Sequence, residues 1–192
     1  MGIRPKTDAL MKRAVFFDRD GVINELVDRG NNFSVRGKKI RYTAPFSYEE
    51  FFLKPQVKES LMTLEQLGFL RILVTNQPDL SYKLLKEDEH GRIMESVKTL
   101  AFNDIFVCPH GRDESCHCKK PNPGMLIEAI QKWDIDPSAS YMIGDTQNDI
   151  TAGKAAGCKT IIIDYHYNKD AEADARVANL HEAVEMIRDR IH

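Results

Sequence analysis

The sequence predicts a doubly wound α/β fold, in which helices cover both faces of a parallel β-sheet. Short apolar runs that end in polar residues alternate along the chain with longer segments in which apolar residues recur at helical spacing. Buried strands of parallel sheets have such nearly continuous apolar runs, and the right-handed crossover between two parallel strands usually contains a helix. The alternation is therefore typical of a Rossmann-like sheet between two layers of helices.

Five apolar runs are predicted to form the strands of this sheet. Each is short and is followed by a polar loop, as expected for a strand that is buried on both faces. The runs are residues 15–17, 71–74, 105–107, 141–143 and 160–163.

Between these runs, four groups of apolar residues have the three- and four-residue spacing of a buried helix face. Gly68 and Gly157 mark the ends of two helices, and the turn at residues 134–138 marks the end of a third. The apolar positions are Val57, Leu61, Leu64 and Leu67; Ile93, Val97 and Leu100; Leu126, Ile130 and Trp133; and Val184, Ile187 and Ile191.

Length and composition indicate one globular domain over residues 1–192, since 42% of the residues are hydrophobic and 29% are charged. The 27 Lys and Arg residues nearly balance the 29 Asp and Glu residues, so no general field attracts nucleic acid or anionic lipid. No apolar run approaches the ~18–20 residues that span a bilayer, and residues 1–13 lack the apolar centre of a secretory signal. We therefore expect a cytoplasmic protein without a membrane partner.

Residues 24–54 do not follow the alternation of strand and helix, and we interpret them as an insertion. The segment is rich in Gly, Asn, Lys, Arg and aromatic residues, and it begins shortly after the first predicted strand. It can either fold over that end of the sheet as a minimal cap or cross the surface with its aromatic residues packed on the sheet edge. The residue pattern leaves both alternatives open.

Polar side chains follow four of the predicted strands, where loops of a parallel sheet converge on one crevice. Several carboxylates beside one or two lysines would repel one another without a divalent cation, and hard oxygen ligands favour Mg²⁺. The residues concerned are Asp18 and Asp20, Thr75 and Asn76, Lys119 and Lys120, and Asp145 and Asp149. The sequence therefore predicts a site for magnesium and an anion.

Four segments resemble, in order, the four motifs of the haloacid-dehalogenase superfamily. They are FFDRDGV at residues 16–22, VTNQ at 74–77, KKPNPGM at 119–125 and IGDTQND at 143–149. The resemblance implies a phosphatase that works through an aspartyl-phosphate, with Asp18 as nucleophile and Asp20 as general acid and base. It also implies that Mg²⁺ is held by the carboxylates of Asp18 and Asp145 and by the backbone carbonyl of Asp20.

Physical chemistry agrees with these roles. A carboxylate attacks an anionic phosphoryl group only when a cation neutralises both, and a second carboxylate two positions away can protonate the leaving oxygen. The side chains expected to hold the phosphate oxygens are those of Thr75, Asn76, Lys119 and Lys120. Asp149 either supports the metal ligands or only caps the helix that ends near Gly157.

A second cluster predicts a structural zinc site. Residues 108–118 contain Cys-x-His and, after five intervening residues, Cys-x-Cys. Three thiolates and one imidazole complete the tetrahedral shell of Zn²⁺ and leave no position for an activated water. The expected ligands are Cys108, His110, Cys116 and Cys118, although His117 could replace His110. Cys158 lies apart from them and is expected to be a buried thiol.

A zinc loop directly before the third motif resembles the branch that contains heptose 1,7-bisphosphate phosphatases and histidinol-phosphate phosphatases. The expected substrate is therefore a small phosphorylated metabolite, a sugar phosphate or bisphosphate first and histidinol phosphate second. In this chain, residues 78–82 lack the glycines and the arginine of the heptose-type loop, and Thr146 replaces a common lysine. We hypothesise that substrate selection has moved to the basic residues of the insertion, which are Arg36, Lys38, Lys39 and Arg41.

Two other functions are compatible with parts of this pattern. A non-catalytic module could grip nucleic acid with its zinc loop and basic insertion, but the balanced charge and the complete set of acids argue against it. A polynucleotide-end phosphatase would use the same catalytic residues, and it would require an open cleft beside a basic groove.

Overall fold

A sheet of six parallel strands forms the centre of the computed structural model, which describes residues 11–191. The strand order is β10-β9-β8-β1-β6-β7, so β1 lies inside the sheet between β8 and β6. The strands are β1 (Arg13–Phe17), β6 (Phe69–Asn76), β7 (Asp104–Cys108), β8 (Tyr141–Gly144), β9 (Lys159–Ile163) and β10 (Ala175–Val177). Because all of them are parallel, their carboxyl ends lie along one edge.

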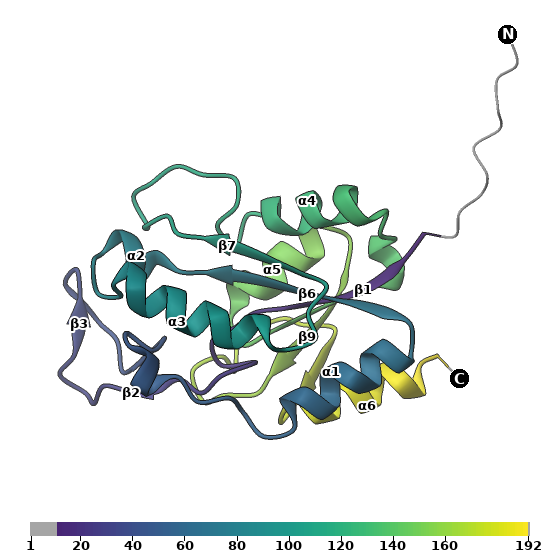
Figure 1. The fold of residues 1–192 in the computed structure, drawn as a ribbon, viewed down its shortest axis with the longest axis horizontal. Coiled ribbons are helices and arrows are strands. Elements are labelled where there is room, and N and C mark those ends of the chain that lie inside the picture. Colours follow the sequence, from purple (N-terminus) through teal and green to yellow (C-terminus); the bar gives the residue numbers. More distant parts are fainter. Residues whose placement is uncertain (1–10, 192) are drawn as a thin grey trace, which may run out of the picture.

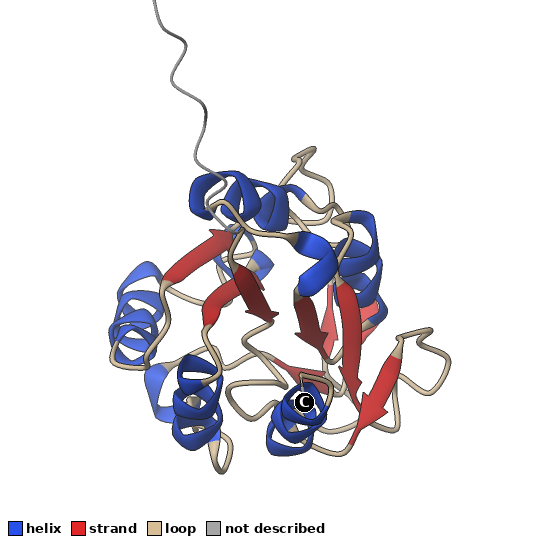
Figure 2. Cartoon of the chain, turned by 90° about the vertical axis from the view of Figure 1, so that its right-hand side faces the viewer, coloured by secondary structure: helices blue, strands red, loops and turns tan. Residues whose placement is uncertain are grey.

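Helices cover both faces of the sheet (Figure 1, Figure 2). On one face lie α1 (Val57–Gln66), α3 (Glu87–Lys98) and α6 (Leu180–Asp189), and on the other lie α4 (Gly124–Trp133) and α5 (Gln147–Ala155). The short helices α2 (Pro78–Ser81), η1 (Tyr48–Glu50) and η2 (Pro137–Ala139) lie in connecting segments. The predicted doubly wound class is confirmed.

The side chains of β1 alternate between the two cores that these helices complete. Val15 and Phe17 belong to the core beneath α1, α3 and α6, whereas Ala14 and Phe16 belong to the core beneath α4 and α5. All four side chains are fully buried. Packing on both faces therefore fixes the end of β1, from which the loop with Asp18 and Asp20 begins.

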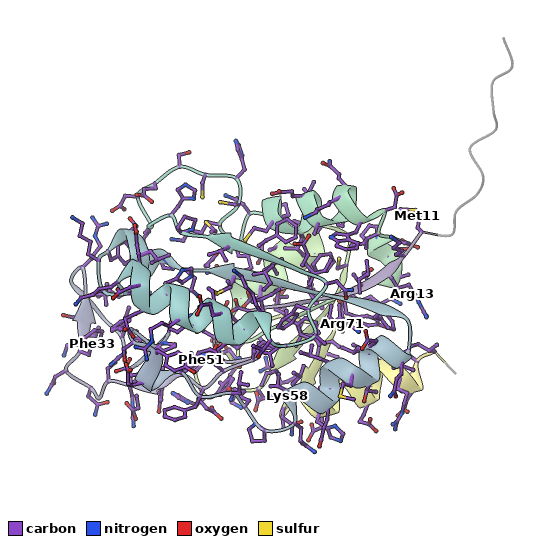
Figure 3. All side chains as sticks on the ribbon, viewed as in Figure 1. Met11, Arg13, Phe33, Phe51, Lys58 and Arg71 are labelled. Carbon is purple, nitrogen blue, oxygen red and sulfur yellow. The ribbon has the colours of Figure 1, made fainter. Side chains whose placement is uncertain are left out.

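Residues 24–54, predicted as an insertion, form two short antiparallel ribbons outside the main sheet. In one ribbon β2 (Val27–Asp28) pairs with β5 (Tyr42–Thr43), and in the other β3 (Ser34–Val35) pairs with β4 (Lys38–Lys39). Phe33, near the tip of the insertion, lies at the opposite end of the molecule from Arg13, the first residue of β1 (Figure 3). The insertion therefore lies beyond the carboxyl end of β1.

Ionic and aromatic contacts hold the insertion together, and a hydrogen bond attaches it to α3. The guanidinium of Arg29 forms two 2.6 Å bonds to the carboxylate of Glu50 and lies 4.2 Å from the centre of the Phe46 ring. The backbone N–H of Tyr48 donates to Glu89 on α3 at 2.6 Å. These contacts compensate for the short strands of the ribbons, which could not hold the insertion in place by themselves.

The five predicted strands and the four helices with apolar periodicity are all present, and their ends differ from the predicted ones by a few residues. The sequence prediction omitted β10 and α2, because segments of three and four residues are too short to show a period. Residues 1–10 and 192 of the predicted domain lie outside the described residues. They include most of residues 1–13, whose lack of an apolar centre contributed to the predicted cytoplasmic location. Within residues 11–191, every helix is too short or too polar to cross a bilayer.

Candidate active site

A cavity of about 590 Å³ lies at the carboxyl ends of β1, β6 and β8. Residues at the ends of β1, β6, β7, β8 and β9 line it together with residues 38–44 of the insertion. The predicted site residues in its wall are Asp18, Asp20, Asn76, Lys120, Asp145 and Asp149. The chain therefore brings together acids and a lysine that are far apart in sequence, and the insertion faces them.

Three carboxylates gather in this cavity, and one lysine pairs with two of them. Asp18, Asp145 and Asp149 each place an oxygen within 4.8 Å of the others. The Lys120 ammonium lies 2.8 Å from Oδ1 of Asp18 and 2.5 Å from Oδ1 of Asp149, and it donates to the carbonyl of Val74. Burial raises the pKa of Asp18 to about 7, and the charges of Asp149 and Asp20 add to this shift. Lys120 lowers the pKa, but its single positive charge does not compensate for these effects.

The donor set at this point fits a divalent cation. Asp145 is only 3% exposed, and its Oδ1 atom is buried without a hydrogen-bond partner among residues 11–191. Burial, followed by the charges of Asp149 and Asp18, raises the pKa of Asp145. A buried carboxylate oxygen without a partner is costly, and carboxylate oxygens are the ligands that Mg²⁺ prefers. These residues therefore match the chemistry predicted for a magnesium site.

Two glycines allow the acids to approach the backbone closely. Gly21 has a φ of +83°, and a Cβ atom on it would lie 2.4 Å from Oδ2 of Asp145. A Cβ atom on Gly144 would lie 2.1 Å from the Cβ of Asp149. Any larger residue at either position would push a carboxylate out of the cluster.

Asp20 lies beside Asp18 in sequence, but its carboxylate is held by a separate set of donors. Arg19, which is fully buried, donates to Oδ1 of Asp20 at 2.9 Å, and Asn24 donates to the same oxygen at 3.0 Å. Gln77 donates from Nε2 to Oδ2 at 2.7 Å. The two acids of the first motif therefore lie in different surroundings, one against a lysine and the other within an arginine and amide network.

The four residues predicted to hold phosphate lie in different places. Asn76 lines the cavity, and its amide exchanges two 3.0 Å hydrogen bonds with the backbone of Lys120. Thr75 is fully buried beneath the cavity and accepts a hydrogen bond from Gln77. Lys119 points elsewhere, because its ammonium donates to the carbonyl of His110 at 2.9 Å. Of the two lysines, only Lys120 is at the cavity wall.

The loop that follows β7 gathers the predicted zinc ligands. Ligand atoms of Cys108, His110, Cys116 and Cys118 lie within 4.8 Å of one another. The Sγ atoms of Cys108 and Cys116 are 3.8 Å apart, and Nδ1 of His110 is 3.4 Å from Sγ of Cys108. A tetrahedral site with Zn–S bonds of about 2.3 Å has edges of about 3.8 Å, so the cluster fits zinc. His117 is exposed and lies outside it.

Comparison with models of protein families shows which family this chain belongs to. The model of the haloacid dehalogenase-like hydrolases matches residues 24–157. The chain belongs to the haloacid dehalogenase-like hydrolase family. The match covers the motifs around Thr75, Lys120 and Asp145, while the segment with Asp18 and Asp20 lies just before it. The predicted family and enzyme class are confirmed.

Curated relatives in this family are named as phosphatases. The D-glycero-beta-D-manno-heptose-1,7-bisphosphate 7-phosphatase of Pasteurella multocida (strain Pm70) is 33% identical over 165 residues, which cover 80% of this chain and 82% of the relative. The enzyme of the same name from Helicobacter pylori (strain J99 / ATCC 700824) is 32% identical over 184 residues, which cover 92% of this chain and 97% of the relative.

Solved structures show the same fold. The crystal structure of D,D-heptose 1.7-bisphosphate phosphatase from B. bronchiseptica, complexed with magnesium and phosphate, matches with a TM-score of 0.75 and 24% identity, covering 93% of this chain and 99% of that chain. A putative HAD-like phosphatase from Mesorhizobium loti matches with a TM-score of 0.67 and 24% identity, covering 93% of this chain and 87% of that chain. At this identity the likeness establishes the hydrolase fold.

The residues that follow β9 were not among the predicted site residues. Tyr167 donates from its hydroxyl to Oδ2 of Asp145 at 2.5 Å, and the side chain of Asn168 donates to the Asp145 carbonyl at 2.7 Å. His166 and Tyr167 also line the cavity. The rule that loops at the carboxyl ends of parallel strands converge applies to this loop too, and it could have identified these residues.

Proposed function

We propose that this hydrolase is a Mg²⁺-dependent phosphatase that acts on a small sugar bisphosphate, with heptose 1,7-bisphosphate as the first candidate. The observation that carries the proposal is the pairing of Asp18 with Lys120 beside the buried, unpartnered oxygen of Asp145. The choice of heptose 1,7-bisphosphate is supported by the names of the relatives. The cavity agrees with a substrate of this size, because about 590 Å³ is enough for a small phosphorylated metabolite.

The carboxylates of Asp18 and Asp145, with the backbone carbonyl of Asp20, would hold Mg²⁺. When bound, the cation supplies positive charge that neutralises the attacking carboxylate and the phosphate oxygens. Asp149 already has two other partners, since Oδ1 pairs with Lys120 and Oδ2 accepts from the hydroxyl of Thr146. Its capping bond to the backbone of Thr146 fixes the start of α5, so we assign it a supporting role.

Asp18 would attack phosphorus with a carboxylate oxygen while the bond from phosphorus to the substrate alcohol breaks. Asp20 would give its proton to the leaving oxygen and then take a proton from the water that hydrolyses the aspartyl-phosphate. Arg19 and Gln77 hold Asp20 in place for both steps. Lys120 and Asn76 line the cavity, and they would stabilise the charge on the phosphate oxygens.

The Cys and His cluster would hold a structural Zn²⁺ that fixes the loop before Lys120. The ammonium of Lys119 binds the carbonyl of His110, one of the four proposed ligands. All four cysteines are free thiols, which agrees with the expected reducing, cytoplasmic location. The zinc loop would therefore act on catalysis indirectly, by positioning the segment that carries Lys120.

Histidinol phosphate is the second candidate substrate, because the segment that stands in place of the heptose-type loop puts an acid, Asp79, in the cavity wall. Asp79 lines the cavity and forms no ion pair among residues 11–191. Its carboxylate can accept a hydrogen bond from a substrate amine, and histidinol phosphate has one. Sugar hydroxyls can donate to the same carboxylate, so Asp79 is compatible with both candidates.

A substrate panel tests the proposal. Phosphate release would be measured with Mg²⁺ and with EDTA for heptose 1,7-bisphosphate, histidinol phosphate, p-nitrophenyl phosphate and a 5′-phosphorylated oligonucleotide. We expect metal-dependent release, with the highest kcat/KM for the heptose bisphosphate. Preference for the oligonucleotide would favour the polynucleotide-end alternative, and no metal-dependent release from any compound would refute the proposal.

A further inference from the structure

The loop that follows β9, residues 164–171, holds the metal-binding loops from one side. Besides the bonds from Tyr167 and Asn168 to Asp145, the hydroxyl of Tyr165 donates to the carbonyl of Gly21 at 2.9 Å. Gly21 directly follows Asp20, and Asp145 directly follows β8. One loop therefore contacts both segments that carry the proposed magnesium ligands.

This loop is itself firmly held. The Arg176 guanidinium donates to the carbonyls of Asn168, Lys169 and Ala171 at 3.0–3.2 Å and pairs with Asp164 at 2.7 Å. The rings of Tyr165 and Tyr167 stack at 5.1 Å with an angle of 7° between their planes. A hydroxyl on such a support is fixed before any ligand arrives.

We propose that Tyr167 is a positioning residue for the metal ligand Asp145. Its hydroxyl occupies Oδ2 and thereby fixes the rotation of the carboxylate, while Oδ1, the oxygen without a partner, stays available to the cation. The inference rests on the proposed function, because it assumes that Asp145 binds Mg²⁺. Its basis is this chain's own hydrogen bond between Tyr167 and Asp145.

The energetic consequence follows from preorganisation. A carboxylate that rotates freely loses that freedom when it binds a metal, whereas a carboxylate already fixed by a hydrogen bond loses little. Loss of a hydrogen-bond partner behind a metal ligand typically weakens metal binding by about 10–100-fold. Replacing Tyr167 by Phe removes only the hydroxyl and keeps the ring stacked on Tyr165, so it isolates this effect.

Direct Mg²⁺ binding to the substrate-free protein tests the inference. Isothermal titration calorimetry with MgCl₂ should give a Kd about tenfold higher for Tyr167→Phe than for the wild type. Tyr48→Phe is the matched control, because Tyr48 lies on η1, outside the cavity, and its loss of a hydroxyl should leave the Kd unchanged. Circular dichroism would verify that both variants are folded.

Kinetics separates a positioning role from a structural one. With p-nitrophenyl phosphate, Tyr167→Phe should need about tenfold more Mg²⁺ for half-maximal rate and should approach the wild-type kcat at saturating Mg²⁺. An unchanged Mg²⁺ Kd would overturn the inference, and a lower Kd would overturn it by showing that the hydroxyl competes with the cation. If the wild type itself bound no Mg²⁺ and released no phosphate, the proposed function would fail instead.

Discussion

Lys120 pairs with Asp18 across 102 positions of the sequence, with 2.8 Å between the ammonium nitrogen and Oδ1. The lysine side chain is only 2% exposed, and its charge also pairs with Asp149. Burial opposes its protonation, but the charges of Asp149 and Asp18 outweigh this and raise the pKa of Lys120. A permanent positive charge therefore lies beside the proposed nucleophile.

Replacing Lys120 by Met should impair both stability and catalysis. Removing one partner of a buried ion pair costs about 3–5 kcal/mol of unfolding free energy, because the acids lose their buried cation. Loss of a group that stabilises transition-state charge should lower kcat by about 10²–10³-fold. Chemical denaturation and steady-state kinetics measure the two effects.

Lys119→Met is the matched control for that experiment. Its ammonium binds the carbonyl of His110 and does not line the cavity, so we expect kcat to stay within about tenfold of the wild type. Equal losses in the two variants would contradict the different roles that the structure gives the two lysines.

Asp18→Asn should abolish turnover while leaving the fold intact, because an amide neither attacks phosphorus nor neutralises a metal. The expected loss in kcat is several decades, about 10⁴-fold or more, as for other covalent nucleophiles. Asp88→Asn, on the exposed start of α3, serves as the control and should keep wild-type activity. Near-normal turnover by Asp18→Asn would exclude the aspartyl-phosphate mechanism.

Much of this site follows from the sequence because its residues stand directly after apolar strands. Asp18, Asn76 and Asp145 were placed by the strand ends alone, and parallel topology then brings them together. The position of Lys120 depended on the family motif, since nothing in its local pattern distinguishes it from the neighbouring Lys119. Their different directions are decided by tertiary contacts, with Val74 for Lys120 and with His110 for Lys119.

The insertion shows where sequence reasoning stops. Its composition indicated a departure from the sheet, but its strands of two residues have no readable period. Which of its basic side chains face the cavity depends on long-range partners. Arg36 pairs with Asp113 of the Cys and His loop at 2.8 Å, whereas Lys38 and Lys39 line the cavity.

Zinc analysis should distinguish the two candidate histidine ligands. Wild-type protein prepared without chelator should contain one zinc per chain, and His110→Asn should lose most of it and unfold at a lower temperature. His117→Asn should keep its zinc, because His117 is exposed and outside the cluster. Elemental analysis that found no zinc in the wild type, or loss only with His117→Asn, would contradict the assigned ligands.

The two cavity lysines of the insertion should select for a second phosphate. Neither Lys38 nor Lys39 forms an ion pair within residues 11–191, so both charges are available to a substrate. Replacing both by Ala should raise KM for heptose 1,7-bisphosphate about tenfold, with less than about a threefold change for p-nitrophenyl phosphate.

Arg36→Ala is the control for this pair, since the same insertion carries Arg36 but its guanidinium contacts Asp113 outside the cavity. We expect both KM values to stay near those of the wild type. Equal losses on both substrates in the lysine variant would indicate damage to the shared phosphate site. No loss on either substrate would mean that the insertion does not contribute to substrate selection.

Asp79→Asn should raise stability in a manner that depends on pH. Burial, reinforced by the charge of Asp20, raises the pKa of Asp79 from 3.8 to about 6. A raised acid pKa means that the folded state binds the proton more tightly than the unfolded state does, so protonation stabilises the fold at low pH and this stabilisation is lost as pH rises through about 6. At pH 8 the wild type carries the full cost of the buried charge, and the amide should add roughly 1–2 kcal/mol to the unfolding free energy. Urea titrations at pH 8 and pH 5 should show this gain shrinking at the lower pH, whereas Asp189→Asn, on the exposed end of α6, should show the same small change at both. A gain that was equal at the two pH values would mean that Asp79 is not the group whose ionisation opposes folding.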